Sequence, residues 1–326
     1  MTLATGIGSW PGTSVRDGLA QVRELLDGQL PYLPELPERG PGADMVGRTA
    51  GLLVELPVDL QPVGWRFVDR PGRDAARTAA LLREDLDELA EAFDGHTGPL
   101  KLQVVGPWTL AASLWLQRGE RVVVDDGACR DLVDSLAEGV RLHVAAVRRL
   151  VPGAEVVLQL DEPSLPTVLA GRLPTASGFG RLPSLDPQVA ARGLQTVLRA
   201  HDGPTVVHCC ASSPPVPLLR AAGPGALSLD TSLLRPREWE GVAVAVEDGI
   251  RLHAGVVPTD GGRTRATQLA DELVSAWTRV GLPLARLADL VVTPACGLGA
   301  ATPPVARAVQ RAAVETAREL EERSAG

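Results

Sequence analysis

The chain has 326 residues, of which 45% are hydrophobic and 22% charged, a composition with enough apolar material for a full core. Acidic residues outnumber Lys and Arg by 40 to 32, giving a formal net charge of −8, which argues against a nucleic-acid partner because phosphate binding needs a basic surface. No apolar run approaches the roughly 20 residues of a membrane span, and MTLATGIGSWPG at the start does not resemble a signal peptide. We therefore expect a soluble, cytoplasmic protein without a membrane partner.

Short β-rich apolar runs alternate along the chain with longer amphipathic stretches. The runs predict strands at Leu3–Ser9, Leu52–Leu56, Leu102–Gly106, Val156–Leu160, Thr205–Cys210, Ala226–Asp230, Arg251–Val257 and Leu290–Cys296. The stretches predict helices at Val15–Leu26, Asp74–Phe93, Arg130–Leu150, Pro187–Ala200, Pro214–Ala222, Arg237–Val246, Ala266–Val280 and Pro303–Arg323. Asp186 and Thr302 each precede a proline, as helix N-cap residues often do.

Eight strand–helix units predict an α/β fold, a single-domain (β/α)8 TIM barrel over residues 1–326. The alternative is a doubly wound open sheet, but no G-x-G-x-x-G turn follows the first strand. The proline-rich segments Pro31–Pro41 and Pro166–Pro187 are expected to be surface excursions. Lys101 is the single lysine of the chain, beside 31 arginines, which we interpret as a composition bias without functional meaning.

Residue types that carry chemistry gather at the predicted strand ends. They are Ser9, Asp161, Glu162, His208, Cys210, Asp230 and Cys296. His253 lies within the seventh predicted strand. Because the carboxyl ends of barrel strands meet at one face, where catalytic residues collect, this placement predicts a functional site there.

The stretch VVHCCASS places His208 and Cys210 on one side of a strand and turns Cys209 away, because side chains alternate. An imidazole and a thiolate suit zinc, and Asp230 and Cys296 would complete a mixed tetrahedral set. The alternatives are an ordinary buried histidine and buried cysteines, and an N-cap role for Asp230.

Two further stretches predict groups that contact a substrate. In QLDEPSL, one of the adjacent acids Asp161 and Glu162 is expected to face the pocket, while the other caps a helix or pairs with an arginine. The turn GIGSWP offers backbone N–H groups and the Ser9 hydroxyl to a carboxylate. For His253, a buried core role and a proton-donating role both remain open.

Eight motifs follow one another in the order IGSWP, GADMV, GPWTL, QLDEPSL, VHCC, LDTS, LHAGVVP and PACGLG. This series resembles the catalytic domain of the cobalamin-independent methionine synthase family. The resemblance runs from about Leu3 to Ala300, and the H-x-C pair and the late C-G-L are its most specific parts. It implies a (β/α)8 barrel, a catalytic zinc and a role in methionine biosynthesis.

The resemblance also implies roles for individual residues. The metal ligands would be His208, Cys210, Asp230 and Cys296. The amino group of homocysteine would be held by Asp161 and by an acid near the family's D-M-V stretch, for which we choose Glu38, with Glu35 as the other candidate. The carboxylate would be held by Ile7 and Ser9. His253 would donate a proton during catalysis, in which Asp161 also takes part.

Three features depart from the family's long form. That form carries an additional N-terminal barrel, which we do not find here, so folate polyglutamate binding is in question. Its metal-binding acid is Glu, where this chain has Asp230. The tryptophan after its G-P-V-T stretch has no equivalent at the same spacing, and Trp108 or Trp115 would have to stack the donor instead.

These features together predict a zinc-dependent methyltransferase that moves a methyl group to the thiol of homocysteine. The donor would be methyltetrahydrofolate or a methylcorrinoid. One alternative is a barrel enzyme resembling uroporphyrinogen decarboxylase, with Arg39 and Arg48 binding propionates, although this would leave H-x-C and C-G-L unexplained. The other alternative is a zinc-binding homologue without catalytic activity.

Overall fold

The computed structural model describes residues 1–262 and 265–325. Its centre is a parallel sheet in the order β1-β9-β8-β7-β6-β5-β4. The strands are β1 (Leu3–Ala4), β4 (Gly98–Val105), β5 (Ala154–Asp161), β6 (Thr205–Cys209), β7 (Ala226–Asp230), β8 (Arg251–Val257) and β9 (Val291–Pro294). All seven were predicted from the sequence, with ends that differ by a few residues.

A proline-containing segment takes the remaining place in the barrel wall, between β1 and β4. On one side, the Leu30 amide donates to the Ala4 carbonyl (3.0 Å), and on the other the Lys101 amide donates to the Pro31 carbonyl (2.8 Å). Further along, the Glu35 amide donates to the Gly8 carbonyl (3.0 Å). Residues 30–35 therefore close the sheet into the expected (β/α)8 barrel.

Two of our expectations about this region are wrong. Leu52–Leu56 is not a strand but a turn and bend after a short helix, and residues 30–35 take its place. The first part of Pro31–Pro41 is not a surface excursion, because Tyr32 and Leu33 are fully buried. Proline has no N–H group and interrupts a ladder of hydrogen bonds, so the sequence of this segment does not read as a strand.

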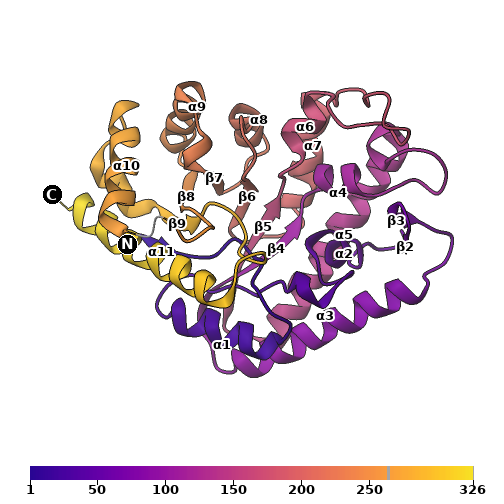
Figure 1. Cartoon of the computed structure of the whole chain (residues 1–326), viewed down its shortest axis with the longest axis horizontal. Helices are drawn as coiled ribbons and strands as arrows, with labels where there is room; N and C mark the ends of the chain where they lie inside the picture. Colours follow the sequence, from indigo (N-terminus) through magenta and orange to yellow (C-terminus); the bar gives the residue numbers. More distant parts are fainter. Residues whose placement is uncertain (263–264, 326) are drawn as a thin grey trace.

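Helices surround the barrel, with α8 and α9 on one side and α1 and α3 on the opposite side (Figure 1). The helices that were predicted are α1 (Val15–Leu25), α3 (Arg73–Ala92), α5 (Asp126–Leu150), α7 (Pro187–Leu198), α8 (Val216–Ala221), α9 (Pro236–Glu247), α10 (Ala266–Arg279) and α11 (Pro303–Ser324). As expected, Asp186 caps α7 by accepting from the amides of Gln188 (2.8 Å) and Val189 (3.0 Å).

Several short elements were not predicted. They are α2 (Met45–Ala50), α4 (Pro107–Ser113), α6 (Leu165–Leu169) and an antiparallel hairpin of β2 (Val58–Gln61) and β3 (Gly64–Phe67). Each has too few residues to show a clear hydrophobic period, so they escape a pattern-based reading. In the described part of the chain, no helix combines the length and apolar character needed to cross a membrane.

The barrel interior changes from apolar to polar along the strands. A small cluster of buried apolar residues fills its base: Leu30, Val157, Val206 and Ala226. Two residues further along β5, β6 and β7 lie the buried polar side chains Gln159, His208 and Ser228. Two residues further again lie Asp161, Cys210 and Asp230. Because strand side chains alternate, the same face of each strand supplies both the base and the functional end.

The burial of Lys101 gives a direct test of the barrel. Its side chain is wholly inaccessible, so an amine-directed acylating reagent should modify native protein only at the chain's amino terminus. After denaturation the lysine becomes accessible, and mass spectrometry should then find a second adduct. The variant Lys101→Met, denatured in the same way, should carry one adduct. Rapid acylation of Lys101 in native protein would contradict the closed barrel described above.

Candidate metal centre and adjoining cavity

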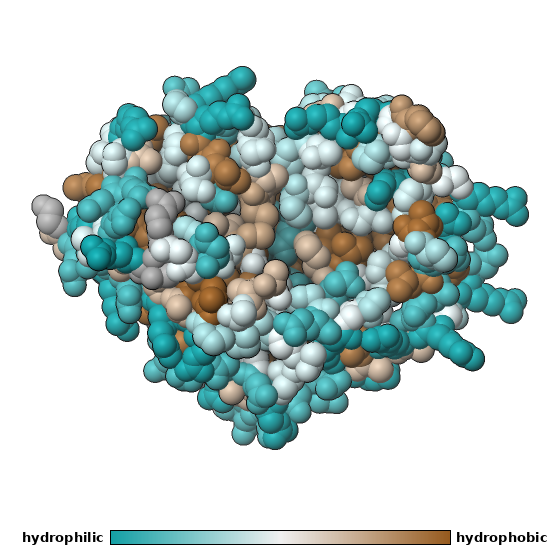
Figure 2. Space-filling model, in the orientation of Figure 1, coloured by the Kyte–Doolittle hydropathy of each residue, from teal (hydrophilic) through white to brown (hydrophobic). Residues whose placement is uncertain are grey.

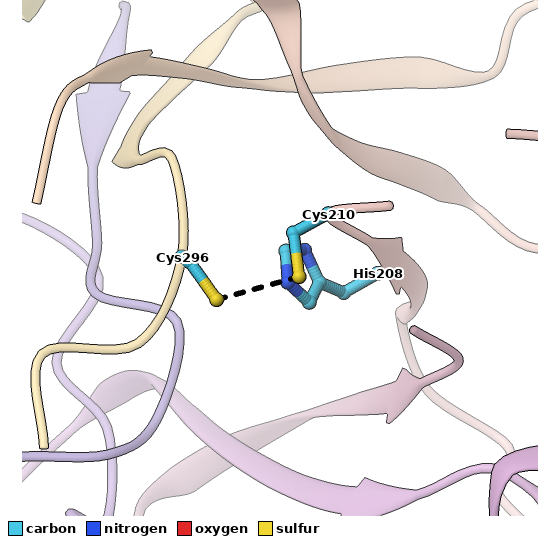
Figure 3. Close-up of side chains that lie close together, drawn as sticks. All are labelled: His208, Cys210 and Cys296. Carbon is cyan, nitrogen blue, oxygen red and sulfur yellow. Dashed lines mark hydrogen bonds between the residues drawn. The ribbon is translucent and has the colours of Figure 1, made fainter. Parts of the chain in front are cut away.

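His208, Cys210 and Cys296 point toward one another at the carboxyl end of the barrel (Figure 3). Their potential ligand atoms all lie within 4.8 Å of one another, and the two Sγ atoms are 3.3 Å apart. His208 is near the end of β6, Cys210 follows it, and Cys296 lies just beyond β9. Barrel closure thus brings together residues that are 86 positions apart in the chain.

The donor atoms of this cluster fit a metal. His208 Nδ1 lies 3.0 Å from Ser228 Oγ and 3.2 Å from the Ser228 carbonyl oxygen. Among the residues that the structure describes, the buried Nε2 has no hydrogen-bond partner. An imidazole held through one nitrogen, with the other free, is the usual arrangement of a metal-binding histidine. The hydrogen bond between the two sulfurs lowers the pKa of Cys296, with His208 acting in the same direction, and raises the pKa of Cys210. The pair thus shares one proton, which a metal bound to both sulfurs would displace.

The other two cysteines lie elsewhere. Cys209 is 1% exposed, on the opposite side of the strand from the cluster, as the alternation predicts. Burial raises its pKa to about 12. Cys129 is buried on α5, and burial likewise raises its pKa to about 12. Thiols in such surroundings are unreactive.

Asp230 lies at the end of β7, but its carboxylate is engaged locally. Oδ1 accepts from the Ser232 amide (3.0 Å) and the Ser232 hydroxyl (2.6 Å), capping the short helix Thr231–Leu233. Among the described residues, the group within 4.8 Å consists of the histidine and two cysteines without Asp230. The geometry therefore matches the N-cap alternative, and a ligand role for Asp230 stays a proposal.

A cavity of about 440 Å³ adjoins the cluster. Residues from several strand ends line it, including Ile7, Ser9, Glu35, Asp44, Met45, Asp161, His208, Cys210 and Cys296. The molecular surface in the same orientation as Figure 1 is hollowed near its middle, over the strands (Figure 2). Three predicted substrate contacts, Ile7, Ser9 and Asp161, thus share one cavity with the three clustered metal-binding candidates.

The turn after β1 and the loop carrying Cys296 pack directly on each other. The Ser9 hydroxyl accepts from the Gly299 amide (3.0 Å), and the Ser9 carbonyl accepts from the Leu298 amide (2.9 Å). A Cβ atom on Gly297 would lie 2.2 Å from Ser9 Oγ, so a larger residue there would displace the hydroxyl from its bond to Gly299. This close approach explains the glycines of C-G-L-G and couples the position of Cys296 to the GIGSW turn.

The adjacent acids of QLDEPSL divide into two roles, as expected. Asp161 lines the cavity and accepts from Gln159 Nε2 (2.7 Å). Glu162 faces the other way and caps α4, accepting from the amides of Trp108 (2.9 Å) and Thr109 (2.8 Å). Burial raises the pKa of Asp161, and it raises that of Glu162 to about 7. Glu162 therefore has a structural role, whereas the carboxylate of Asp161 faces the cavity and is available to a ligand.

The second buried acid of the cavity is Glu35, whereas Glu38 does not line it. Glu35 is 3% exposed and lines the cavity, whereas the carboxylate of Glu38 accepts from the Gly12 amide (3.0 Å) in an exposed turn. Residues 30–35 form part of the barrel wall and carry Glu35 into the cavity, whereas Glu38, our first choice, lies beyond the wall. A contact between either acid and a substrate amine stays a prediction. Burial raises the pKa of Glu35 to about 7, against the opposing influence of Arg48.

Two arginines considered for binding propionates have internal partners instead. The guanidinium groups of Arg39 and Arg48 both pair with the buried carboxylate of Asp85 on α3. These pairs tie the segment that follows Glu35 to α3. Neither arginine is among the residues that line the cavity, so the structure does not support a propionate-binding mouth built on them.

Trp108, one of the two rings expected to stack the donor, lies in the core and away from the cavity. It is 1% exposed, and its Nε1 donates to the Ala190 carbonyl on α7 (2.8 Å). Trp115, the other candidate, is 6% exposed and packs against the Arg121 guanidinium, 4.8 Å from its ring centroid. Neither ring lines the cavity beside the cluster. Both belong to the packing around α4.

His253 occupies the core position that was the alternative to a proton donor. It lies in the middle of β8, is 2% exposed, and does not line the cavity. Burial, followed by the charges of Arg251 and Lys101, lowers the pKa of His253 to about 3. In this environment the imidazole is neutral near pH 7, which matches the core alternative, and a proton-donating role for His253 stays a prediction.

Pattern-based reasoning missed Gln159 and Lys101, which lie in the interior just below the cavity. The Lys101 ammonium donates to the Ile7 carbonyl (2.6 Å) and to Gln159 Oε1 (2.9 Å). The period-two rule could have found Gln159, because it precedes Asp161 by two residues. No sequence signal points to Lys101, whose neighbours are apolar.

Comparisons with known proteins agree with this architecture. The family model described as the catalytic domain of cobalamin-independent synthase matches residues 1–319. A solved B12-independent methionine synthase from Shewanella sp. W3-18-1, in complex with selenomethionine, is similar with a TM-score of 0.52 and 16% identity. The match covers 73% of this chain and 66% of that one, just under two thirds of its length. At this identity it shows the fold alone. No curated protein matches the chain.

The low pKa of His253 predicts a pH dependence of stability. The native imidazole stays neutral down to about pH 3, whereas an unfolded histidine binds a proton below about pH 6.5. The contribution of His253 to the free energy of unfolding should therefore fall as the pH drops from 6.5 toward 4, whereas Glu35 and Glu162, whose pKa values burial raises to about 7, contribute in the opposite sense. The difference between wild type and His253→Asn isolates the imidazole, and it should change by up to about 1.4 kcal/mol per pH unit.

The measurement is denaturant unfolding across this pH range, with a chelator present so that metal release adds no dependence of its own. His143→Asn provides a parallel, since burial also lowers the pKa of His143 to about 3. An unchanged slope in His253→Asn would show that the native imidazole accepts protons freely.

Proposed function

Because this chain belongs to the cobalamin-independent synthase catalytic-domain family, a family of methyltransferases, we propose that it transfers a methyl group to the thiol of homocysteine and so forms methionine. The observation that carries the proposal is the convergence of one free imidazole nitrogen and two thiols beside a cavity with two buried acids. We further propose that the chain acts as one domain and in the cytoplasm.

Zinc is the proposed cofactor. His208, Cys210 and Cys296 would hold it, with Asp230 as a fourth ligand whose competing bonds to Ser232 make it the easiest to displace. When bound, zinc keeps a substrate thiol deprotonated and nucleophilic near neutral pH. Ser228 supports the set by holding His208 through Nδ1.

The cavity supplies groups for the rest of homocysteine. Asp161 and Glu35 are buried acids that would take up its ammonium group, whose charge favours the ionised form of both. The turn from Ile7 to Ser9 would receive the carboxylate through backbone N–H groups and the Ser9 hydroxyl. A ligand held at both groups would leave its thiol free to approach the two cysteines.

The methyl donor is proposed to be methyltetrahydrofolate or a methylcorrinoid, and the structure favours the second. An amine leaving group needs a proton, which the neutral and buried His253 is not placed to give. A pterin ring gains from an aromatic partner, but Trp108 and Trp115 lie in the packing around α4. A corrinoid leaves as reduced cobalt and needs neither group.

Turnover is the experiment that tests the function. Zinc-loaded protein is supplied with homocysteine and either methylcobalamin or methyltetrahydrofolate, and methionine is measured. Methionine formed with either donor, and lost with Cys296→Ser, is the expected result. If neither donor gave methionine while zinc was bound stoichiometrically, the chain would be a zinc-binding homologue without this activity.

Substitution distinguishes the two proposed cysteine ligands, Cys210 and Cys296, from the neighbouring Cys209. Cys210→Ser and Cys296→Ser should each lower the zinc content by tenfold or more, because a neutral hydroxyl replaces a thiolate. Cys209→Ser is the matched control and should keep its zinc, since Cys209 lies on the other side of the strand. Elemental analysis of the purified proteins gives the answer. Full zinc occupancy in both cluster variants would exclude the assignment.

The two acids on either side of Pro37 form a second matched pair. Glu35→Gln removes a buried charge from the cavity and should weaken homocysteine binding about tenfold to a hundredfold, as expected for a charge-assisted hydrogen bond. Glu38→Gln changes an exposed turn and should leave the affinity within about twofold. Calorimetry on zinc-loaded protein measures both. A larger loss of affinity in Glu38→Gln than in Glu35→Gln would assign the contact with the homocysteine amine to Glu38.

A further inference from the structure

Two buried side chains below the cavity link the turn after β1 to the end of β5. Gln159 Nε2 donates to the Ile7 carbonyl (2.9 Å) and to Asp161 Oδ1 (2.7 Å). The Lys101 ammonium donates to the same Ile7 carbonyl (2.6 Å) and to Gln159 Oε1 (2.9 Å). Lys101 is on β4 and Gln159 on the neighbouring β5, so these bonds run across three parts of the barrel wall.

Lys101, Ile7 and Asp161 together determine which way the Gln159 amide points. An ammonium group can only donate hydrogen bonds, so the Gln159 oxygen must face it. The amide nitrogen then faces the other way, where its two hydrogens meet two acceptors, Ile7 O and Asp161 Oδ1. Turning the amide over would set its oxygen against these two acceptors and its nitrogen against the ammonium group, so the partners on both sides of Gln159 fix the same orientation.

A lysine buried at this position only for packing would destabilise the fold, because its ammonium group loses its hydration. The side chain is 0% exposed, and burying an ammonium group costs several kcal/mol unless it is well compensated. Its compensation comes from the bonds just described, from the Tyr32 ring 5.2 Å away, and from the charges of Asp161 and Glu35. A methionine would fill much of the same volume without that desolvation.

We propose that Lys101 and Gln159 are positioning residues that form a brace, holding the Ile7–Ser9 turn and Asp161 at the separation of an α-carboxylate and an α-ammonium group. This rests on the proposed function, in which these two places receive those two groups. The brace selects thiols that carry both groups on one carbon, and it gives the single lysine of the chain a function that we did not expect from composition.

The brace predicts a loss that depends on the ligand. A ligand that carries both groups must contact Asp161 and the Ile7–Ser9 turn at the same time, so its affinity depends on their separation. A ligand with one group contacts only one of them, so its affinity does not depend on that separation. The variants Lys101→Met and Gln159→Leu should therefore weaken binding of L-methionine tenfold or more. They should weaken 4-(methylthio)butyrate, which lacks the amine, and 3-(methylthio)propylamine, which lacks the carboxylate, by less than about threefold.

The measurement is calorimetry on zinc-loaded protein, and it does not depend on turnover. Gln310→Leu is the control, because Gln310 is also a wholly buried glutamine but lies on α11, away from the brace. Its affinities should match the wild type. Zinc content and melting temperature establish that each variant is folded, and Gln159→Asn, which keeps an amide but shortens its reach, serves if Gln159→Leu does not fold.

The outcomes separate the brace from the proposed function. Selective loss of L-methionine binding supports the brace. Unchanged L-methionine binding in Lys101→Met and Gln159→Leu overturns it, and so does an equal loss for all three ligands, which indicates general disruption. If wild-type protein binds no L-methionine and forms none, the proposed function fails together with the brace; wild-type binding without a variant effect overturns the brace alone.

Discussion

Backbone hydrogen bonds from residues 30–35 to β1 on one side and β4 on the other close the sheet, and the geometry of the site depends on that closure. An open sheet would leave the ends of β1 and β5 at a distance set only by loops. In the closed barrel, Ser9, Asp161, His208 and Cys296 come from four parts of the chain and line one cavity. The segment also carries Glu35 into that cavity, so the same backbone bonds build the wall and deliver a functional side chain.

Side-chain alternation then sets the depth at which each residue lies. On β5 the inward face runs from Val157 through Gln159 to Asp161, and on β6 from Val206 through His208 to Cys210. The apolar base excludes water and lowers the local dielectric, which strengthens hydrogen bonds among the polar groups above it. Under those conditions a carboxylate or an ammonium group must be paired, and Lys101, Gln159 and Asp161 meet this requirement through one another.

Neighbouring acids acquire different roles from their surroundings. Asp161 and Glu162 are adjacent and both buried, yet Glu162 accepts hydrogen bonds at the start of α4 while Asp161 faces the cavity. A Cβ atom on Gly106 would lie 2.4 Å from Glu162 Oε1, so the glycine before α4 makes room for the cap. Glu35 and Glu38 differ in the same way, one in the barrel wall and the other in an exposed turn.

The amino-acid sequence by itself determined the alternation of strands and helices, the strand-end position of the reactive groups, and the separation of His208 and Cys210 from Cys209. These follow from local periodicity, which needs no knowledge of distant contacts. Only the tertiary structure decided that a segment with two prolines completes the barrel, since its bonds go to residues far away in the chain. It likewise placed Glu35 in the cavity and Glu38 in an exposed turn, buried Trp108 and His253 in the core, and set the contacts of Lys101. Burial and the partner of a side chain depend on what the rest of the chain packs against it, and no local pattern carries that information.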